Sequence, residues 1–300
     1  MLSSMGFATV LVWAPSTRWW ALAAGNACVV KPAEDASLSS LRVAELAAEA
    51  GFPAGALNIV TGYGHEAGDS LVAHPLVRKV WFTGGPESAR FVAARAAEHL
   101  KPLVLELGGK SANIFFDDVR IDDVLNGVIA GIFAAAGQTC VAGSRLLAHE
   151  SIADELVAKV AARARTIRLG DPSDEQTEMG PMSQEKILAG VRMRVQEALG
   201  EGANLIAGGD DGDRPDNGWF YAPTVLDRVR PEMTVVREET FAPLLYVMSY
   251  RDLDEAIVMA IASADENSDA NVRGGAFENI DAFRQGVLGG LAVCSTITTK

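Results

Sequence analysis

One thiol and one carboxylate, placed 34 residues apart, could carry chemistry in this chain. Glu106 stands in the segment L-E-L-G-G-K-S-A, at the end of an apolar run. Cys140 stands in the segment G-Q-T-C-V-A-G-S-R, where most of its neighbours are small. A thiol can form a covalent acyl intermediate, and a carboxylate can act as the base that activates water to release the acyl group. The two residues together therefore predict acyl-transfer chemistry.

Each of the two residues also has a simpler interpretation. A cysteine is usually a small buried hydrophobe, and a glutamate at a strand end is usually a solvated charge. However, a glycine-rich turn around Cys140 would present backbone N–H groups that favour the thiolate and bind an oxyanion. A carboxylate set into an apolar run, as Glu106 is expected to be, would suit a base near neutral pH. The residues alone leave both interpretations open for Cys140 and for Glu106.

Composition limits the classes of function. The 300 residues predict about two domains, and 49% hydrophobic residues allow a sizeable core. The net charge of −13 opposes binding to nucleic acid or to an anionic membrane, and no apolar run reaches the roughly 20 residues that span a bilayer. Three widely spaced cysteines (Cys28, Cys140 and Cys294) and four scattered histidines predict neither a disulfide framework nor a metal site. This cysteine usage predicts a cytoplasmic protein.

The first third of the chain alternates short β-branched runs with helical periods, which predicts a parallel sheet with crossover helices. The expected buried strands are residues 27–31, 57–60, 79–83 and 102–106, and the expected helices are 37–50, 64–73 and 87–100.

The pattern starts afresh after Gly108-Gly109, so we place a domain boundary near Gly108. Beyond it, the expected strands are residues 112–116 and 224–226, and the expected helices are 122–135, 151–168 and 184–199. A polar, glycine-rich stretch at 208–218 reads as a loop.

The two motifs and their separation resemble the active-site signatures of the NAD(P)-dependent aldehyde dehydrogenase superfamily. The resemblance implies an α/β fold, with a partial Rossmann-type NAD-binding domain at 1–108 and an α/β catalytic domain at 109–300. It also implies an oxidoreductase that converts a small-molecule aldehyde into a carboxylic acid with NAD. In that reaction the Cys140 thiolate would form a thiohemiacetal and then a thioester, and water activated by Glu106 would hydrolyse the thioester.

The resemblance also assigns contacts to the adenosine and pyrophosphate parts of the cofactor. Lys31 and Glu34, in the segment K-P-A-E, would lie at the adenosine ribose. The carboxylate of Glu34 would repel a 2′-phosphate, so NAD is expected rather than NADP. Thr83, Gly84 and Gly85 form a strand-to-helix turn of the kind that presents N–H groups to phosphate. The family usually carries a serine in place of Gly85, so this chain lacks that side-chain contact to the pyrophosphate.

The segment E-E-T-F-A-P at 238–243 resembles the family's E-E-x-F-G-P. By that resemblance Glu239 would hold the nicotinamide ribose, Phe241 would pack beside the nicotinamide ring, and Leu107 would complete the cofactor site. Ala242 replaces the usual glycine. The segment M-G-P at 179–181 is a further family landmark, which we expect to be structural.

The resemblance runs from about residue 21 to residue 293 and weakens at both ends, so we expect a chain truncated at each end. Residues 10–20 lack the asparagine of the family's P-W-N-x-P segment, which supplies an oxyanion donor. Losing one such donor typically lowers turnover by roughly 10²–10³-fold. Cys294 stands where the family has an asparagine, and residues 261–271 depart from its usual pattern.

Three interpretations of function therefore stay open. The first is an active aldehyde dehydrogenase. The second is a catalytically silent or impaired relative that keeps only the fold or cofactor binding. The third is a coenzyme-A-acylating relative, against which the presence of Glu106 argues. The sequence leaves the identity of the aldehyde open. It also leaves open whether the chain forms a homo-oligomer, because the resemblance does not include the family's bridging segments.

Overall fold

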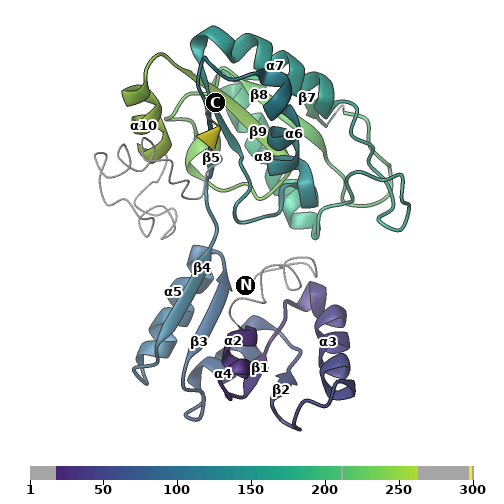
Figure 1. The fold of residues 1–300 in the computed structure, drawn as a ribbon, viewed down its shortest axis with the longest axis vertical. Coiled ribbons are helices and arrows are strands. Elements are labelled where there is room, and N and C mark those ends of the chain that lie inside the picture. Colours follow the sequence, from purple (N-terminus) through teal and green to yellow (C-terminus); the bar gives the residue numbers. More distant parts are fainter. Residues whose placement is uncertain (1–17, 211, 263–296, 299–300) are drawn as a thin grey trace. The chain divides into compact units, whose positions relative to one another are not determined.

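The computed structural model describes residues 18–210, 212–262 and 297–298 (Figure 1). The chain divides into two compact units, Met1–Leu107 and Gly108–Lys300.

The first unit is built from two parallel strand pairs. Strand β1 (Cys28–Val30) pairs with β2 (Leu57–Ile59), and β3 (Val80–Gly84) pairs with β4 (Leu103–Leu107). Helix α3 (Ser37–Glu49) lies between β1 and β2 in the sequence, and α5 (Pro86–Ala97) lies between β3 and β4. Each pair is therefore a βαβ unit, as the alternation of strand and helix patterns predicts. The remaining elements are α2 (Arg18–Ala23), a 3₁₀ turn η2 (Glu34–Ala36), a π-helical turn η3 (Gly64–Gly68) and α4 (Asp69–Ala73).

Two expectations for the first unit are wrong in part. The helix expected at 64–73 begins as the π-helical turn η3 and becomes α-helical only at Asp69. The strands are not uniformly buried, since Val29 is 47% exposed and Trp81 is 39% exposed. Among the described residues each strand of this unit pairs with one neighbour only, so the other edge of each strand has no ladder partner there.

The second unit is organised around a six-stranded sheet in the order β10-β5-β6-β9-β8-β7. All neighbouring strands are parallel except β7 and β8. The central strands are buried along most of their length, which fits strands covered on both faces. The strands are β5 (Ala112–Phe115), β6 (Arg145–His149), β7 (Asn204–Gly209), β8 (Ala222–Asp227), β9 (Leu244–Tyr250) and β10 (Ile297–Thr298).

Helices α6 (Ile121–Phe133) and α7 (Glu150–Ala164) pack against each other beside this sheet (Figure 1). In α6 the buried residues recur at helical spacing, which turns one apolar stripe toward the core: Ile121, Val124, Val128 and Ile132. The other helices are α8 (Glu185–Gly200), α9 (Thr234–Arg237) and α10 (Leu253–Ala262), and a 3₁₀ turn η4 (Ala134–Gly137) follows α6. Within the described part of the chain, no helix has the length and apolar character needed to cross a membrane.

Candidate functional site

Four residues singled out in the sequence share one edge of the β3–β4 pair. In the register of this pair Thr83 lies opposite Glu106, and Gly84 lies opposite Leu107. All four stand at the carboxyl ends of parallel strands, which is where α/β proteins usually bind ligands. The fold of the first unit therefore brings Thr83, Gly84, Glu106 and Leu107 together.

The turn after β3 leads directly into α5. Gly85 is the N-cap, in an extended conformation, and Pro86 occupies the first helical position. A β-carbon built on Gly85 would meet no atom within 4 Å, so the space beside the helix N-terminus is open. Backbone N–H groups at such a terminus suit a phosphate group.

Lys31 joins the ends of β1 and β2. Its Nζ donates to the carbonyl oxygen of Gly62 at 2.9 Å and to Oε2 of Glu34 at 3.3 Å. The side chain of Lys31 is 5% exposed, whereas that of Glu34 is 30% exposed. Lys31 is thus a buried structural tie that also fixes Glu34, and the Glu34 carboxylate stays accessible to a ligand.

Glu106 is exposed, and the apolar surroundings expected for it are not found. The side chains of β4 alternate between its two faces, so Leu107 is buried while Glu106 points the other way. The leucines beside it in the sequence therefore do not enclose its carboxylate.

In the second unit Cys140 lies on a loop of residues 137–144, which we call the thiol loop. Three consecutive residues in the left-handed region lead into it: Ala135 with φ 50°, Ala136 with φ 53° and Gly137 with φ 70°. This conformation is unfavourable for alanine, so the turn is held by its surroundings rather than by local preference. The Cys140 side chain is partly buried and forms no disulfide.

Close contacts fix both ends of the thiol loop. A β-carbon on Gly137 would overlap the carbonyl oxygen of Ala242, and a β-carbon on Gly143 would overlap the side-chain amide of Asn113. The Gly143 N–H donates to the carbonyl oxygen of Gly131 in α6 at 2.9 Å. Glycine is therefore required at positions 137 and 143 because two other segments pack against the loop there.

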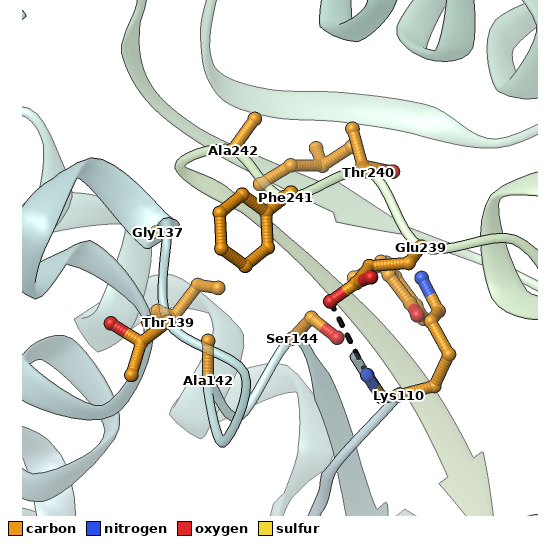
Figure 2. Close-up of a pocket in the computed structure, with 13 residues that line it drawn as sticks. Lys110, Gly137, Thr139, Ala142, Ser144, Glu239, Thr240, Phe241 and Ala242 are labelled. Carbon is orange, nitrogen blue, oxygen red and sulfur yellow. Dashed lines mark hydrogen bonds between the residues drawn. The ribbon is translucent and has the colours of Figure 1, made fainter. Parts of the chain in front are cut away.

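A small cavity of about 10 Å³ lies beside the thiol loop, which is about the room that one water molecule needs (Figure 2). Most of its lining residues precede β5, β6 or β9, and Leu244 and Tyr246 belong to the start of β9, so the cavity lies at the amino edge of these parallel strands. Figure 2 shows Phe241 and Glu239 on one side of it and Thr139, Ala142 and Ser144 on the other. The E-E-T-F-A-P segment and the thiol loop, about 100 residues apart in sequence, thus line one cavity.

Glu239 is packed onto the glycine pair of the first motif. The N–H of Gly109 donates to Oε1 of Glu239 at 3.3 Å, and a β-carbon on Gly108 would overlap this carboxylate. Phe241, two residues later, has a left-handed backbone with φ 52°. The conformation of this segment is therefore also imposed by tertiary contacts.

Lys110 anchors the same segment and was not foreseen as a site residue. It is 2% exposed, and its Nζ donates to the carbonyl oxygens of Val235 at 2.9 Å and Glu238 at 2.8 Å. Its ammonium also lies 4.6 Å from the ring centroid of Tyr246, a favourable cation–π distance. The position of Lys110 within the first motif is the sequence feature that could have identified it.

Arg145, directly after the thiol loop, is also buried. Its guanidinium donates to three carbonyl oxygens, those of Lys110 at 2.6 Å, Met259 at 2.9 Å and Ala260 at 3.0 Å. Burial lowers the pKa of Arg145 to about 10, so the side chain stays charged at neutral pH. It ties the end of the first motif to the end of α10.

The expectations about residues 10–17, about most of 261–271 and about Cys294 lie outside the described residues. Among the residues that are described, no group of three His, Cys, Asp or Glu side chains could hold a metal ion.

One unit thus has an open helix N-terminus at the carboxyl ends of its strands, and the other carries the thiol loop. Residues 10–266 match the family described as "Aldehyde dehydrogenase family", and the chain belongs to this family.

Relatives of known function include the hydroxyisobutyraldehyde dehydrogenase of Mycolicibacterium austroafricanum, which is 46% identical over 79% of this chain and 47% of its own length. The betaine aldehyde dehydrogenase of Brucella anthropi is 40% identical over 80% of this chain and 50% of its own length. The chain thus spans about half the length of these relatives.

Solved structures agree with this assignment. A point mutant of an aldehyde dehydrogenase from Bacillus cereus superposes with a TM-score of 0.81 at 37% identity, covering 84% of this chain and 51% of its own. The betaine aldehyde dehydrogenase of Staphylococcus aureus, solved in complex with NAD⁺, gives a TM-score of 0.77 at 38% identity, over 81% and 48% of the two chains. The fold is therefore the α/β fold of this family.

Proposed function

We propose that this chain oxidises a small aldehyde to a carboxylic acid with NAD, through a covalent intermediate on Cys140. The observation that carries the proposal is the thiol loop, which carries a partly buried thiol and whose left-handed residues and two crowded glycines hold it against Ala242 and Asn113. A loop that is fixed at this conformational cost is expected where a reactive group must be positioned.

The chemistry starts at the sulfur atom of Cys140. The thiolate attacks the aldehyde carbon and forms a C–S bond, which yields a thiohemiacetal. NAD, when bound, would supply the hydride acceptor, so that the thiohemiacetal on Cys140 would become a thioester. A water molecule then attacks the thioester, the C–S bond breaks, and the thiol and the carboxylic acid are released.

Glu106 is the proposed base for that last step. Its exposed carboxylate would accept the proton of the attacking water, and it occupies the strand end next to Thr83. In the sequence Glu106 stands three residues before Gly109, whose N–H donates to the carboxylate of Glu239.

Features of the first unit support the proposed binding of NAD. The open N-terminus of α5 beside Gly84 and Gly85 suits the pyrophosphate, and Glu34, held by Lys31, suits a ribose diol. We therefore assign cofactor binding mainly to the first unit and covalent catalysis to the second. Leu107, Glu239 and Phe241 are the proposed contacts to the nicotinamide half.

The test is aldehyde-dependent NADH formation by the purified chain, with hydroxyisobutyraldehyde and betaine aldehyde as probes. Cys140→Ala should abolish NADH formation. Glu106→Gln should allow about one NADH per chain and then stop, because the thioester forms and is not hydrolysed. Cys28→Ala, a change of the same type in β1, is the control and should behave like the unsubstituted chain.

Two results would contradict the proposal. One is NADH formation by Cys140→Ala at the rate of the unsubstituted chain. The other is NAD binding, measured by calorimetry, with no NADH formed from either probe, which would support a silent relative instead.

A further inference from the structure

We propose that Gln138 is a positioning residue that sets the place of the Cys140 thiol through a hydrogen-bonded clamp to Ser183. This inference rests on the proposed role of Cys140. The Nε2 of Gln138 donates to the hydroxyl oxygen of Ser183 at 2.9 Å. In return, the backbone N–H of Ser183 donates to Oε1 of Gln138 at 2.9 Å. Both ends of one carboxamide are therefore bonded to one residue, which fixes the plane of that carboxamide.

The partner of the clamp belongs to a rigid segment. Met179 and Met182, on either side of Gly180-Pro181, are 4% and 2% exposed. The N–H of Met182 donates to the carbonyl oxygen of Trp219 at 3.0 Å, and Met179 forms an isolated bridge with Leu169. Ser183 is thus presented by a segment that is itself fixed in the core of the second unit. This gives a reason for the M-G-P motif, which the sequence identified only as structural.

The clamp acts close to the sulfur atom because only Thr139 separates Gln138 from Cys140. The downstream side of Cys140 has its own anchors, with Ala142 N–H bonded to the Thr139 carbonyl and Gly143 tied to α6. The upstream side follows the left-handed turn, where no regular helix supports the chain. The carboxamide of Gln138 is therefore a polar side-chain tie on the upstream side, and removing it should let the thiol move.

The experiment measures the alkylation rate of Cys140 by iodoacetamide in the folded full chain, with the modified peptide quantified by mass spectrometry. Gln138→Ala should slow alkylation about tenfold, because iodoacetamide reacts with the thiolate and a displaced sulfur atom loses the backbone N–H groups that favour the thiolate. Ser183→Ala, which leaves the backbone N–H in place, should slow it less, by about threefold. The double variant should be no slower than Gln138→Ala, because both substitutions remove the same clamp.

Gln138→Glu is the conservative variant. A carboxylate can still accept from the Ser183 N–H and from the Ser183 hydroxyl once that hydroxyl has turned, so the alkylation rate should stay within about threefold of the unsubstituted chain. Gln196→Ala, an exposed change of the same type in α8, is the matched control and should leave the rate unchanged.

An unchanged alkylation rate in Gln138→Ala would overturn the inference. If Gln138→Ala does not fold, an unchanged rate in Ser183→Ala would overturn it. Additive slowing in the double variant would overturn it as well. These outcomes do not depend on turnover, so they stay distinct from failure of the proposed function, which would show as absent NADH formation by the unsubstituted chain.

Discussion

A methyl group added at Gly137 should destabilise the second unit, whereas the same addition at Gly127 should stabilise it. Gly137 has a left-handed backbone, and its β-carbon would overlap the backbone of Ala242 and Pro243. Gly127 lies inside α6, where a β-carbon would meet no atom within 4 Å. The two sites are ten residues apart, so Gly→Ala compares one chemical change in two environments.

The magnitudes follow from these environments. Left-handed backbone costs an alanine about 1–2 kcal/mol, and relieving an overlap in a packed region costs about 1–3 kcal/mol more. Gly137→Ala should therefore lower the free energy of unfolding by about 2–5 kcal/mol. Gly127→Ala should raise it by about 1 kcal/mol, because alanine is the better helix former.

Urea unfolding followed by circular dichroism measures both effects, with linear extrapolation to water. Gly137→Ala should also change the alkylation rate of Cys140 in the folded chain, since the methyl group forces the thiol loop away from Ala242. The reasoning would be refuted by two variants that shift the unfolding free energy equally, or by a Gly137→Ala chain as stable as the unsubstituted one.

Three further predictions concern strain, pH and a buried charge. Ala135→Gly should leave the free energy of unfolding unchanged or raise it, because glycine tolerates left-handed backbone. Ala130→Gly, at an exposed position of α6, should lower it by about 1 kcal/mol in urea unfolding. Equal losses in the two variants would show that Ala135 is not left-handed. Burial raises the pKa of Tyr221 from 10.0 to about 12, so the unfolded chain loses this proton first as the pH rises. Stability should therefore fall by up to about 3 kcal/mol between pH 10 and 12, and Tyr221→Phe should flatten that fall in alkaline urea titrations. Arg145→Met removes the donor from three carbonyl oxygens and should cost about 3 kcal/mol or more, against a smaller loss for Arg145→Lys, by the same unfolding assay.

Local sequence patterns predict much of the fold, and they fail where distant segments decide it. The βαβ pattern of the first unit and helices such as α6 follow from hydrophobic period alone. Strand β6 is five residues long, begins with an arginine and pairs with β9 about 100 residues later, so nothing local marks it. Strand β7 ends in Gly208-Gly209, which reads as a turn, yet both glycines take left-handed backbone where the strand is irregular against β8.

The site shows the same division. Motif chemistry selects Cys140 and Glu239, but the contact between Glu239 and Gly109 joins residues 130 positions apart. Lys110 acts through backbone carbonyls of Val235 and Glu238, and a carbonyl acceptor leaves no mark in the sequence. The apolar residues next to Glu106 in the sequence predict apolar surroundings for its carboxylate. This prediction is wrong because side chains alternate along β4, which places Glu106 on the exposed side.

The central claim is that an acyl group is carried on Cys140 during aldehyde oxidation. The most direct test is intact-protein and peptide mass spectrometry of the Glu106→Gln chain after mixing with NAD and hydroxyisobutyraldehyde. The account predicts that the mass of the acyl group appears on the peptide containing Cys140 and disappears with hydroxylamine. No adduct on that peptide while NADH is formed, or an adduct on Cys28 instead, would contradict it.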